Sequence, residues 1–264
     1  MPPTWRDLPP AGAYARLAET DPREAEATAR LVARLTAADL RDLGINTNCV
    51  PVLDIPAPGS HEIIGDRAYG TTPEGVARLG RAVAEGHLTG GVLPVIKHIP
   101  GHGRAQADSH LELPIVTASR EELSATDFAP FRALNDMPAG MTAHVVFTSI
   151  DPDAPASTSE IVIREVIRGE IGFDGLLMSD DLSMKALSGS MRQRAEAVIR
   201  AGSDVVLHCN GHLDEMEQIA ACVPPLTGQP LRRFKRCLEV LSRSEPFDVA
   251  EAGAALSRAL LAVG

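Results

Sequence analysis

The densest group of residues that could carry out chemistry is the stretch 97–110, where three histidines stand beside a lysine, an arginine and an aspartate. Proline and glycines at positions 100, 101 and 103 are incompatible with a regular helix. We therefore predict a loop that leaves the end of a strand. The stretch reads Lys97-His98-Ile99-Pro100-Gly101-His102-Gly103-Arg104-Ala105-Gln106-Ala107-Asp108-Ser109-His110.

This loop allows two chemical interpretations. In the first, the Asp108 carboxylate orients the His110 imidazole and keeps its proton affinity near neutrality, which suits general acid–base catalysis. In the second, the loop binds zinc, with ligands drawn from His98, His102, Asp108 and His110. The spacing does not match a helical H-E-x-x-H pair, and the proline and glycines need not place the histidines on one face. A third alternative is that these side chains only pack the loop.

Two further segments carry candidate side chains. Asp180 and Asp181 follow an apolar run at 175–177, so one carboxylate could be a nucleophile while the other caps the helix that follows. Capping by both aspartates is the alternative. Arg67 lies in a glycine-rich loop segment, 64–70, and its paired donors suit a substrate clamp, with a surface salt bridge as the alternative.

Composition excludes several classes of protein. The 264 residues include 35 Asp and Glu against 25 Lys and Arg, a net charge of −10, which disfavours a nucleic-acid binder. Aromatic residues make up only 3%, too few for a base-stacking platform. No apolar run is long enough to cross a bilayer and no export signal opens the chain, so we expect a cytoplasmic protein without membrane or nucleic-acid partners. We interpret the four dispersed cysteines as buried thiols of a reducing compartment.

Apolar runs rich in branched residues alternate with helical patterns, which indicates βα units around a parallel sheet in a single domain. The predicted strands are 45–52, 91–96, 139–144, 175–178 and 204–207. Reactive side chains lie at the ends of these predicted strands or directly after them. This is where a (β/α) barrel or a doubly wound sheet places the side chains of its active site. A closed barrel needs eight strands, and only five are evident.

The helical patterns have clear start and stop signals. Asp21 and Thr72 precede prolines as N-caps, and Gly202 follows the fourth pattern as a C-cap. The chain from about residue 213 is also predicted to be helical, and its basic run at 232–236 is interpreted as a solvated helix face. The four predicted helices before this tail are 21–43, 73–88, 159–168 and 190–201.

Taken together, these motifs resemble the bacterial β-N-acetylglucosaminidases of glycoside hydrolase family 3. The K-H-[FI]-P-G-H-G and D-S-H motifs, followed by S-D-D-L-S-M, occur here in the order and spacing of that family. The resemblance runs from about residue 5 to residue 210. The segments that carry it are 51–54, 64–69, 97–103, 108–110, 173–184 and 201–210.

The resemblance implies a retaining exo-β-N-acetylglucosaminidase that removes terminal non-reducing N-acetylglucosamine from peptidoglycan-derived muropeptides. Asp180 would be the nucleophile that forms a glycosyl-enzyme, and His110, oriented by Asp108, would be the general acid and then the base. Most glycosidases use two carboxylates for this work, so the histidine would replace one of them. No cofactor or metal is implied. The sugar hydroxyls would be held by Arg67, Lys97 and His98.

The resemblance also implies a TIM-type (β/α) barrel with a helical C-terminal tail. The family carries three further strands and a D-Q-E-G-G-R-V-Q-R motif ahead of the segment at 5–9. We therefore expect residues 1–264 to form one catalytic domain of family 3 that lacks the N-terminal part of the barrel and keeps about the last five of eight strands. The alternatives are a metal-dependent hydrolase and a catalytically impaired, sugar-binding remnant.

Overall fold

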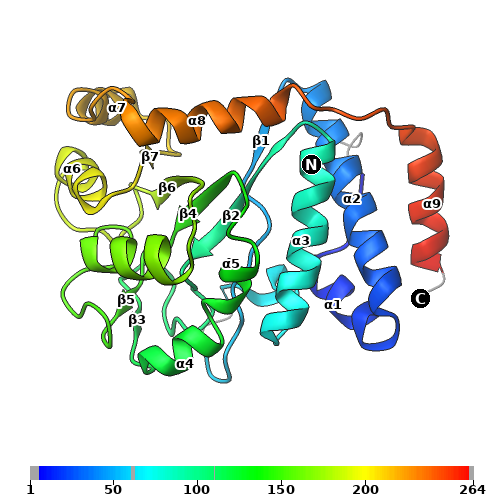
Figure 1. Ribbon diagram of the computed structural model, residues 1–264, viewed down its shortest axis with the longest axis horizontal. Coiled ribbons are helices and arrows are strands. Elements are labelled where there is room, and N and C mark those ends of the chain that lie inside the picture. Colours follow the sequence, from blue (N-terminus) through cyan, green and yellow to red (C-terminus); the bar gives the residue numbers. More distant parts are fainter. Residues whose placement is uncertain (1–5, 61–62, 110, 262–264) are drawn as a thin grey trace.

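The computed structural model describes residues 6–60, 63–109 and 111–261. Its centre is a five-stranded parallel sheet, shown in Figure 1, and the prediction of five parallel strands is confirmed. Along the sheet, the strands are β1 (Thr47–Asn48), β2 (Leu93–Ile99), β4 (Ala139–Thr142), β6 (Leu176–Asp181) and β7 (Val205–Leu207). Two short strands that the sequence did not predict form a separate parallel pair, β3 (Ile115–Val116) with β5 (Val146–Phe147).

The helices begin where the sequence places their caps. The Asp21 carboxylate accepts hydrogen bonds from the first turn of α2 (Pro22–Asp42), and the Thr72 hydroxyl accepts one from the first turn of α3 (Pro73–Thr89). Helix α6 (Met191–Ala201) starts in a capping box at Ser190 and ends at Gly202, whose φ of 111° is left-handed and suits glycine. Local capping chemistry therefore sets these boundaries.

In Figure 1, α8 runs along one side of the sheet, whereas α9 packs on α2 at the edge of the molecule, away from the sheet. The predicted helix at 159–168 forms as a π-helix, η2 (Val162–Glu170), with wider turns than an α-helix. No helix in the described ranges has the length and apolar character of a membrane span. The others are α1 (Ala11–Thr20), η1 (Gly65–Arg67), α4 (Arg120–Ala125), α5 (Ala129–Ala133), α7 (Leu213–Ala220), α8 (Gly228–Leu241) and α9 (Val249–Leu261).

Alternation along the strands divides the sheet into two faces. On one face, Leu93 and Val95 of β2 and Leu176 of β6 pack with Cys237 of α8. On the other, Ile96 and Leu177 belong to a larger cluster with the side chains of the surrounding helices. Because successive side chains in a strand point to opposite faces, Lys97 and Asp180 lie on the same face as the α8 contact, at the carboxyl ends of their strands.

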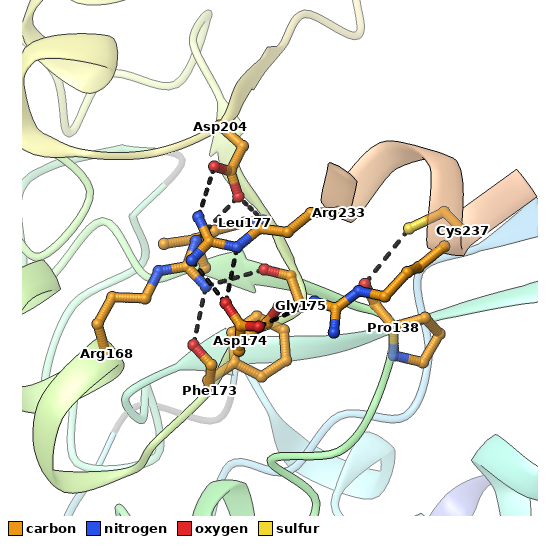
Figure 2. Close-up of polar contacts among 10 residues, drawn as sticks. Pro138, Arg168, Phe173, Asp174, Gly175, Leu177, Asp204, Arg233 and Cys237 are labelled. Carbon is orange, nitrogen blue, oxygen red and sulfur yellow. Dashed lines mark hydrogen bonds and ion pairs between the residues drawn. The ribbon is translucent and has the colours of Figure 1, made fainter. Parts of the chain in front are cut away.

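A buried ion-pair cluster fastens α8 to the opposite, amino ends of the strands (Figure 2). The Asp204 side chain is only 2% exposed and accepts hydrogen bonds from Arg168 of η2 at 2.9 Å and Arg233 of α8 at 3.0 Å. It also accepts the backbone N–H of Leu177 at 2.8 Å, and Asp174 pairs with Arg233 at 2.7 Å. The prediction that the basic run is a solvated helix face is therefore wrong at Arg233, since acidic partners distant in the sequence cover its guanidinium.

The cysteines differ from one another in exposure. All four are free thiols, but only Cys237 is buried, where its sulfur donates to the carbonyl of Pro138 at 3.3 Å. Cys49 and Cys222 are half-buried and Cys209 is exposed. The prediction of four buried thiols is wrong for Cys209, because it follows the last strand of the sheet instead of lying within it.

Replacing Asp204 by Ala should lower the free energy of unfolding by about 3–5 kcal/mol, because two guanidinium groups and a backbone N–H would lose their acceptor. Urea denaturation followed by circular dichroism measures this change. The matched control is Arg243→Ala, which breaks an exposed pair with Glu239 on the same helix–loop segment and should cost less than about 1 kcal/mol. Equal losses in the two variants would contradict a special role for the Asp204 cluster.

Candidate active site

A fully buried carboxylate, Asp54, organises the loop that leaves β2. It accepts the backbone N–H groups of His98 at 3.2 Å and His102 at 2.7 Å, and the Nδ1–H of His98 at 2.6 Å. Burial alone would raise the pKa of Asp54, but the facing histidines and these hydrogen bonds outweigh it and lower the pKa below its ordinary value. The charged carboxylate therefore fixes both the path of the loop and the orientation of the His98 ring.

Because Nδ1 of His98 is bound to Asp54, its Nε2 faces the other way, toward Asp180. The distance from Nε2 to Oδ2 of Asp180 is 3.9 Å. The Asp180 side chain is 15% exposed, and its Oδ1 accepts the backbone N–H of Asp181 at 2.8 Å. Its Oδ2 accepts no hydrogen bond from any residue in the described ranges, which leaves that oxygen available to a ligand.

Burial would raise the pKa of Asp180, yet the charges of His98 and His144, the Asp181 N–H and Lys97 together lower it. His144 is itself held in place, since its Nε2–H donates to the carbonyl of Asp181 at 3.1 Å and its Nδ1 lies 2.7 Å from the Ser157 hydroxyl. Asp180 is therefore an ionised carboxylate in a largely buried, electropositive setting.

Asp181 differs from Asp180 because both of its carboxylate oxygens accept hydrogen bonds from other residues of the chain. Its Oδ1 accepts the N–H groups of Ser183 and Cys209, both at 3.1 Å, and its Oδ2 accepts the Ser183 hydroxyl. The prediction that one or both aspartates cap the following helix is wrong. A turn segment intervenes, and α6 begins only at Met191 with Ser190 as its cap. Asp181 instead ties the end of β6 to the end of β7.

Arg67 and Lys97, both predicted to bind substrate, line one cavity of about 250 Å³ at the carboxyl ends of β1 and β2. Arg67 lies in η1, and its Nη1 donates to the carbonyl of Ile63 at 3.3 Å. The other lining residues are Ala11, Cys49, Val50, Val52 and Tyr69. The structure thus brings Arg67 and Lys97 to one cavity, and it places Lys97 and His98 where they act on Asp180.

The predicted acid–base pair is described only in part, because His110 lies outside the described residues. Its neighbour Ser109 is buried, and the Ser109 hydroxyl lies 3.1 Å from Nε2 of His102. The Ser109 carbonyl accepts the N–H of Ala186 at 3.2 Å, and the Asp108 carbonyl accepts the N–H of Leu111 at 2.8 Å. Ser109 therefore anchors the far end of this loop both to His102, earlier in the same loop, and to the segment after β6.

The metal-binding alternative rests on the same loop. Within the described ranges, no group of three or more His, Cys, Asp or Glu side chains is arranged to hold an ion. His98 and His102 instead turn toward Asp54 and Ser109, with their ring centroids 5.5 Å apart.

Gly103 lets the loop after β2 pack closely against the loop after β1. A Cβ at this position would lie 2.0 Å from the carbonyl oxygen of Ile55.

Sequence reasoning treated Asp54 and His144 only as polar side chains at strand ends and His102 only as a possible zinc ligand, and it gave Ser109 no role of its own. It did not predict the contacts by which these four residues build the site. The signal for Asp54 and His144 was their position, directly after one predicted strand and at the end of another. For His102 and Ser109, the only signal was their place in the histidine-rich loop. What each side chain contacts depends on tertiary structure, because Asp54 and His98 are 44 residues apart.

The sequence model of the glycosyl hydrolase family 3 N-terminal domain matches residues 6–233. A β-hexosaminidase of Alkalilimnicola ehrlichii is 42% identical over 207 residues, which cover 77% of this chain and 59% of that protein. A β-hexosaminidase of Neisseria gonorrhoeae is 43% identical over 190 residues, which cover 70% of this chain and 52% of that protein. The chain thus spans between half and three fifths of the length of these curated relatives.

Solved structures are similar throughout the chain. Native NagZ from Neisseria gonorrhoeae superposes with a TM-score of 0.85 at 34% identity, over 98% of this chain and 77% of that chain. A family 3 β-N-acetylglucosaminidase from a Paenibacillus species gives a TM-score of 0.76 at 33% identity, over 94% and 50% of the two chains. These structures confirm the predicted (β/α) barrel-type fold. Because the family model matches residues 6–233, most of this chain, the chain belongs to glycosyl hydrolase family 3.

Proposed function

We propose that this protein is a retaining β-N-acetylglucosaminidase in which Asp180 is the nucleophile. The observation that carries the proposal is the ionised, largely buried Asp180 carboxylate, whose Oδ2 lies on the His98 side of the site and accepts no hydrogen bond from the described residues. The relatives named β-hexosaminidase support it. So does a structure of NagZ from Neisseria gonorrhoeae in complex with N-trifluoroacetyl-D-glucosamine, which is 34% identical to this chain.

In the first step, Oδ2 of Asp180 attacks the anomeric carbon while the bond from that carbon to the leaving oxygen breaks. His110 gives its proton to the leaving oxygen, and the Asp108 carboxylate orients the ring and stabilises its positive charge before transfer. In the second step, His110 takes a proton from water, which attacks the same carbon and releases Asp180. Two inversions leave the configuration of the sugar unchanged.

The cavity that Arg67 and Lys97 line supplies the groups that hold the sugar. Arg67 and Lys97 line it and offer cationic donors to ring hydroxyls, while His98 lies between Asp54 and Asp180. Charge-assisted hydrogen bonds of this kind are stronger than neutral ones and fix orientation. The substrate we propose is a muropeptide with a terminal non-reducing N-acetylglucosamine, processed in the cytoplasm without a cofactor.

A fluorinated N-acetylglucosaminide inactivator should label Asp180 in the wild-type chain, as detected by peptide mass spectrometry. Asp180→Asn should abolish labelling while the free energy of unfolding stays within about 1 kcal/mol of the wild type, because Asn has the same shape and its amide oxygen can still accept the N–H of Asp181. The matched control is Asp181→Asn, which should keep the label and lose about 1–3 kcal/mol of stability. Labelling of a different residue would refute the nucleophile assignment.

The labelling rate should stay constant from neutral pH down to about pH 4, because a carboxyl with a lowered pKa remains ionised through the range where an ordinary aspartate takes up its proton. The rate falls only as the pH drops through that lowered pKa. His98→Gln removes the imidazole whose electrostatic effect helps to lower the pKa of Asp180, so it should move the fall to higher pH. Circular dichroism at each pH verifies that the variant is folded, and an unchanged pH profile in His98→Gln contradicts the electrostatic role of His98.

His110→Ala should slow hydrolysis most for substrates with poor leaving groups, because only those need a proton donor as the bond breaks. A series of aryl N-acetylglucosaminides that differ in the pKa of the leaving phenol measures the dependence of kcat/KM on that pKa. We expect a loss of about 10²–10⁴-fold for the least acidic phenol and a much smaller one for the most acidic. A uniform loss across the series would show that His110 is not the proton donor.

A further inference from the structure

His208 lies directly after β7, between two carboxylates that belong to different elements. Its Nδ1 is 4.0 Å from Oδ1 of Asp181 at the end of β6, and its Nε2 is 3.3 Å from Oε2 of Glu215 in the first turn of α7. The His208 side chain is only 7% exposed. The imidazole therefore connects the strand that carries Asp180 to the helix that follows β7.

The His208 ring occupies this position without a hydrogen bond. Neither ring nitrogen has a hydrogen-bond partner among the described residues, and neither has Oε2 of Glu215. A buried polar group without a partner destabilises a protein relative to an apolar side chain of similar size. The two preceding residues, Val206 and Leu207, are aliphatic, so packing alone would favour another aliphatic side chain here. The advantage of an imidazole at this position must therefore come from the two carboxylates beside it.

The position of Asp181 determines the direction of the Asp180 carboxylate. The N–H of Asp181 donates to Oδ1 of Asp180 at 2.8 Å. Oδ1 of Asp181 in turn accepts the N–H groups of Ser183 and Cys209, and it is also the oxygen closest to His208. A group that holds the Asp181 side chain in place thus also holds the backbone N–H that orients Asp180.

An imidazole can serve two carboxylates at once. A ring with a proton on each nitrogen presents one N–H to each carboxylate, and both carboxylates attract its positive charge. The side chains of Asp181 and Glu215 are 15% and 26% exposed, so water screens this attraction less than it would at the surface. Glu215 therefore holds the ring from the side of α7, and the ring faces Asp181 from the opposite side.

We propose that His208 is a positioning residue for the glycosidase reaction. Held by Glu215, it fixes the carboxylate of Asp181 and, through the Asp181 N–H, the direction of the Asp180 nucleophile. This inference rests on the proposed function of Asp180. His208 is not among the residues that line the cavity of about 250 Å³, so loss of its donors should slow the chemical step without weakening the binding of the sugar.

His208→Leu keeps much of the side-chain volume and removes both donors. The fluorinated N-acetylglucosaminide inactivator reports the relevant step, because its labelling rate at saturation measures attack by Asp180 and its half-saturating concentration measures binding. We expect the rate at saturation to fall about ten-fold, since a small misplacement of a reacting group is costly. The half-saturating concentration should stay within about two-fold of the wild-type value, as for an interaction that acts only on the chemical step.

His208→Gln tests whether a donor is sufficient. The Gln amide can donate to a carboxylate, so this variant should recover most of the rate that His208→Leu loses. If His208 only filled space, Leu would replace it best and Gln, a polar residue in a buried position, would be the more harmful change. A wild-type rate in His208→Leu, or a lower rate in His208→Gln than in His208→Leu, would overturn the proposal.

His212→Leu is the matched control. It makes the same substitution four residues later, at an exposed histidine that precedes α7 and forms no side-chain cap hydrogen bond. This variant should be labelled at the wild-type rate. A loss equal to that of His208→Leu would show that the effect does not depend on the bridge between the two carboxylates.

Removal of Glu215 tests the other half of the bridge. Glu215→Ala should slow labelling, but in combination with His208→Leu it should cause no further loss, because both changes break the same connection. Glu217→Ala, at an exposed position of the same helix, should have no effect. Losses that multiply in the double variant would contradict the proposal. If His208→Leu does not fold, as judged by circular dichroism, His208→Gln and Glu215→Ala decide.

The backbone amide of Asp181 separates this proposal from the proposed function. In the full chain labelled with ¹⁵N, His208→Leu should shift the amide signal of Asp181, whereas His212→Leu should leave it unchanged. If the inactivator does not label the wild type and no N-acetylglucosaminide is hydrolysed, the proposed function fails, and the amide shift still decides whether His208 positions Asp181. A wild type that is labelled, with no amide shift in His208→Leu, would refute the positioning role alone.

Discussion

The buried Asp54 carboxylate is the interaction on which the rest of the site depends. A charge in the interior is costly unless hydrogen bonds and opposite charges compensate for it. Here, two backbone N–H groups and one imidazole N–H converge on it from a single loop. The requirement to satisfy this one carboxylate therefore dictates how the chain leaves β2, and it leaves the second nitrogen of His98 facing Asp180.

Two neighbouring carboxylates of the same strand acquire different tasks through their surroundings. Asp181 accepts hydrogen bonds from Ser183 and from the N–H of Cys209, and these bonds hold the ends of β6 and β7 together. Asp180 receives one backbone N–H, and electropositive side chains surround it. Two identical side chains on one strand thus differ in how they are bonded, depending on which donors reach them.

The parts that were predicted correctly from the sequence are those set by neighbours along the chain. The parallel strands follow from runs of branched residues, and the cap of α2 follows from Asp21 ahead of Pro22, because those signals operate within a few residues. The predicted grouping of Arg67, Lys97, His98 and Asp180 came from the resemblance to a family. The role of Asp54 and the covered state of Arg233 depend on partners tens of residues away, which no local pattern encodes. For His110, the structure adds nothing to the prediction.

The ion-pair cluster at Asp204 has a consequence for how this domain can be divided. Arg233 of α8 pairs with the Asp204 carboxylate, which also accepts the N–H of Leu177 at the amino end of β6. A helix late in the chain therefore stabilises the amino end of β6, and Asp180 lies at the other end of this strand. A shortened version that stops before residue 233 would lack the Arg233 guanidinium, and the buried Asp204 carboxylate would lose one of its two positively charged partners. Helix α8 is accordingly an integral part of the smallest unit worth expressing, rather than a dispensable appendage.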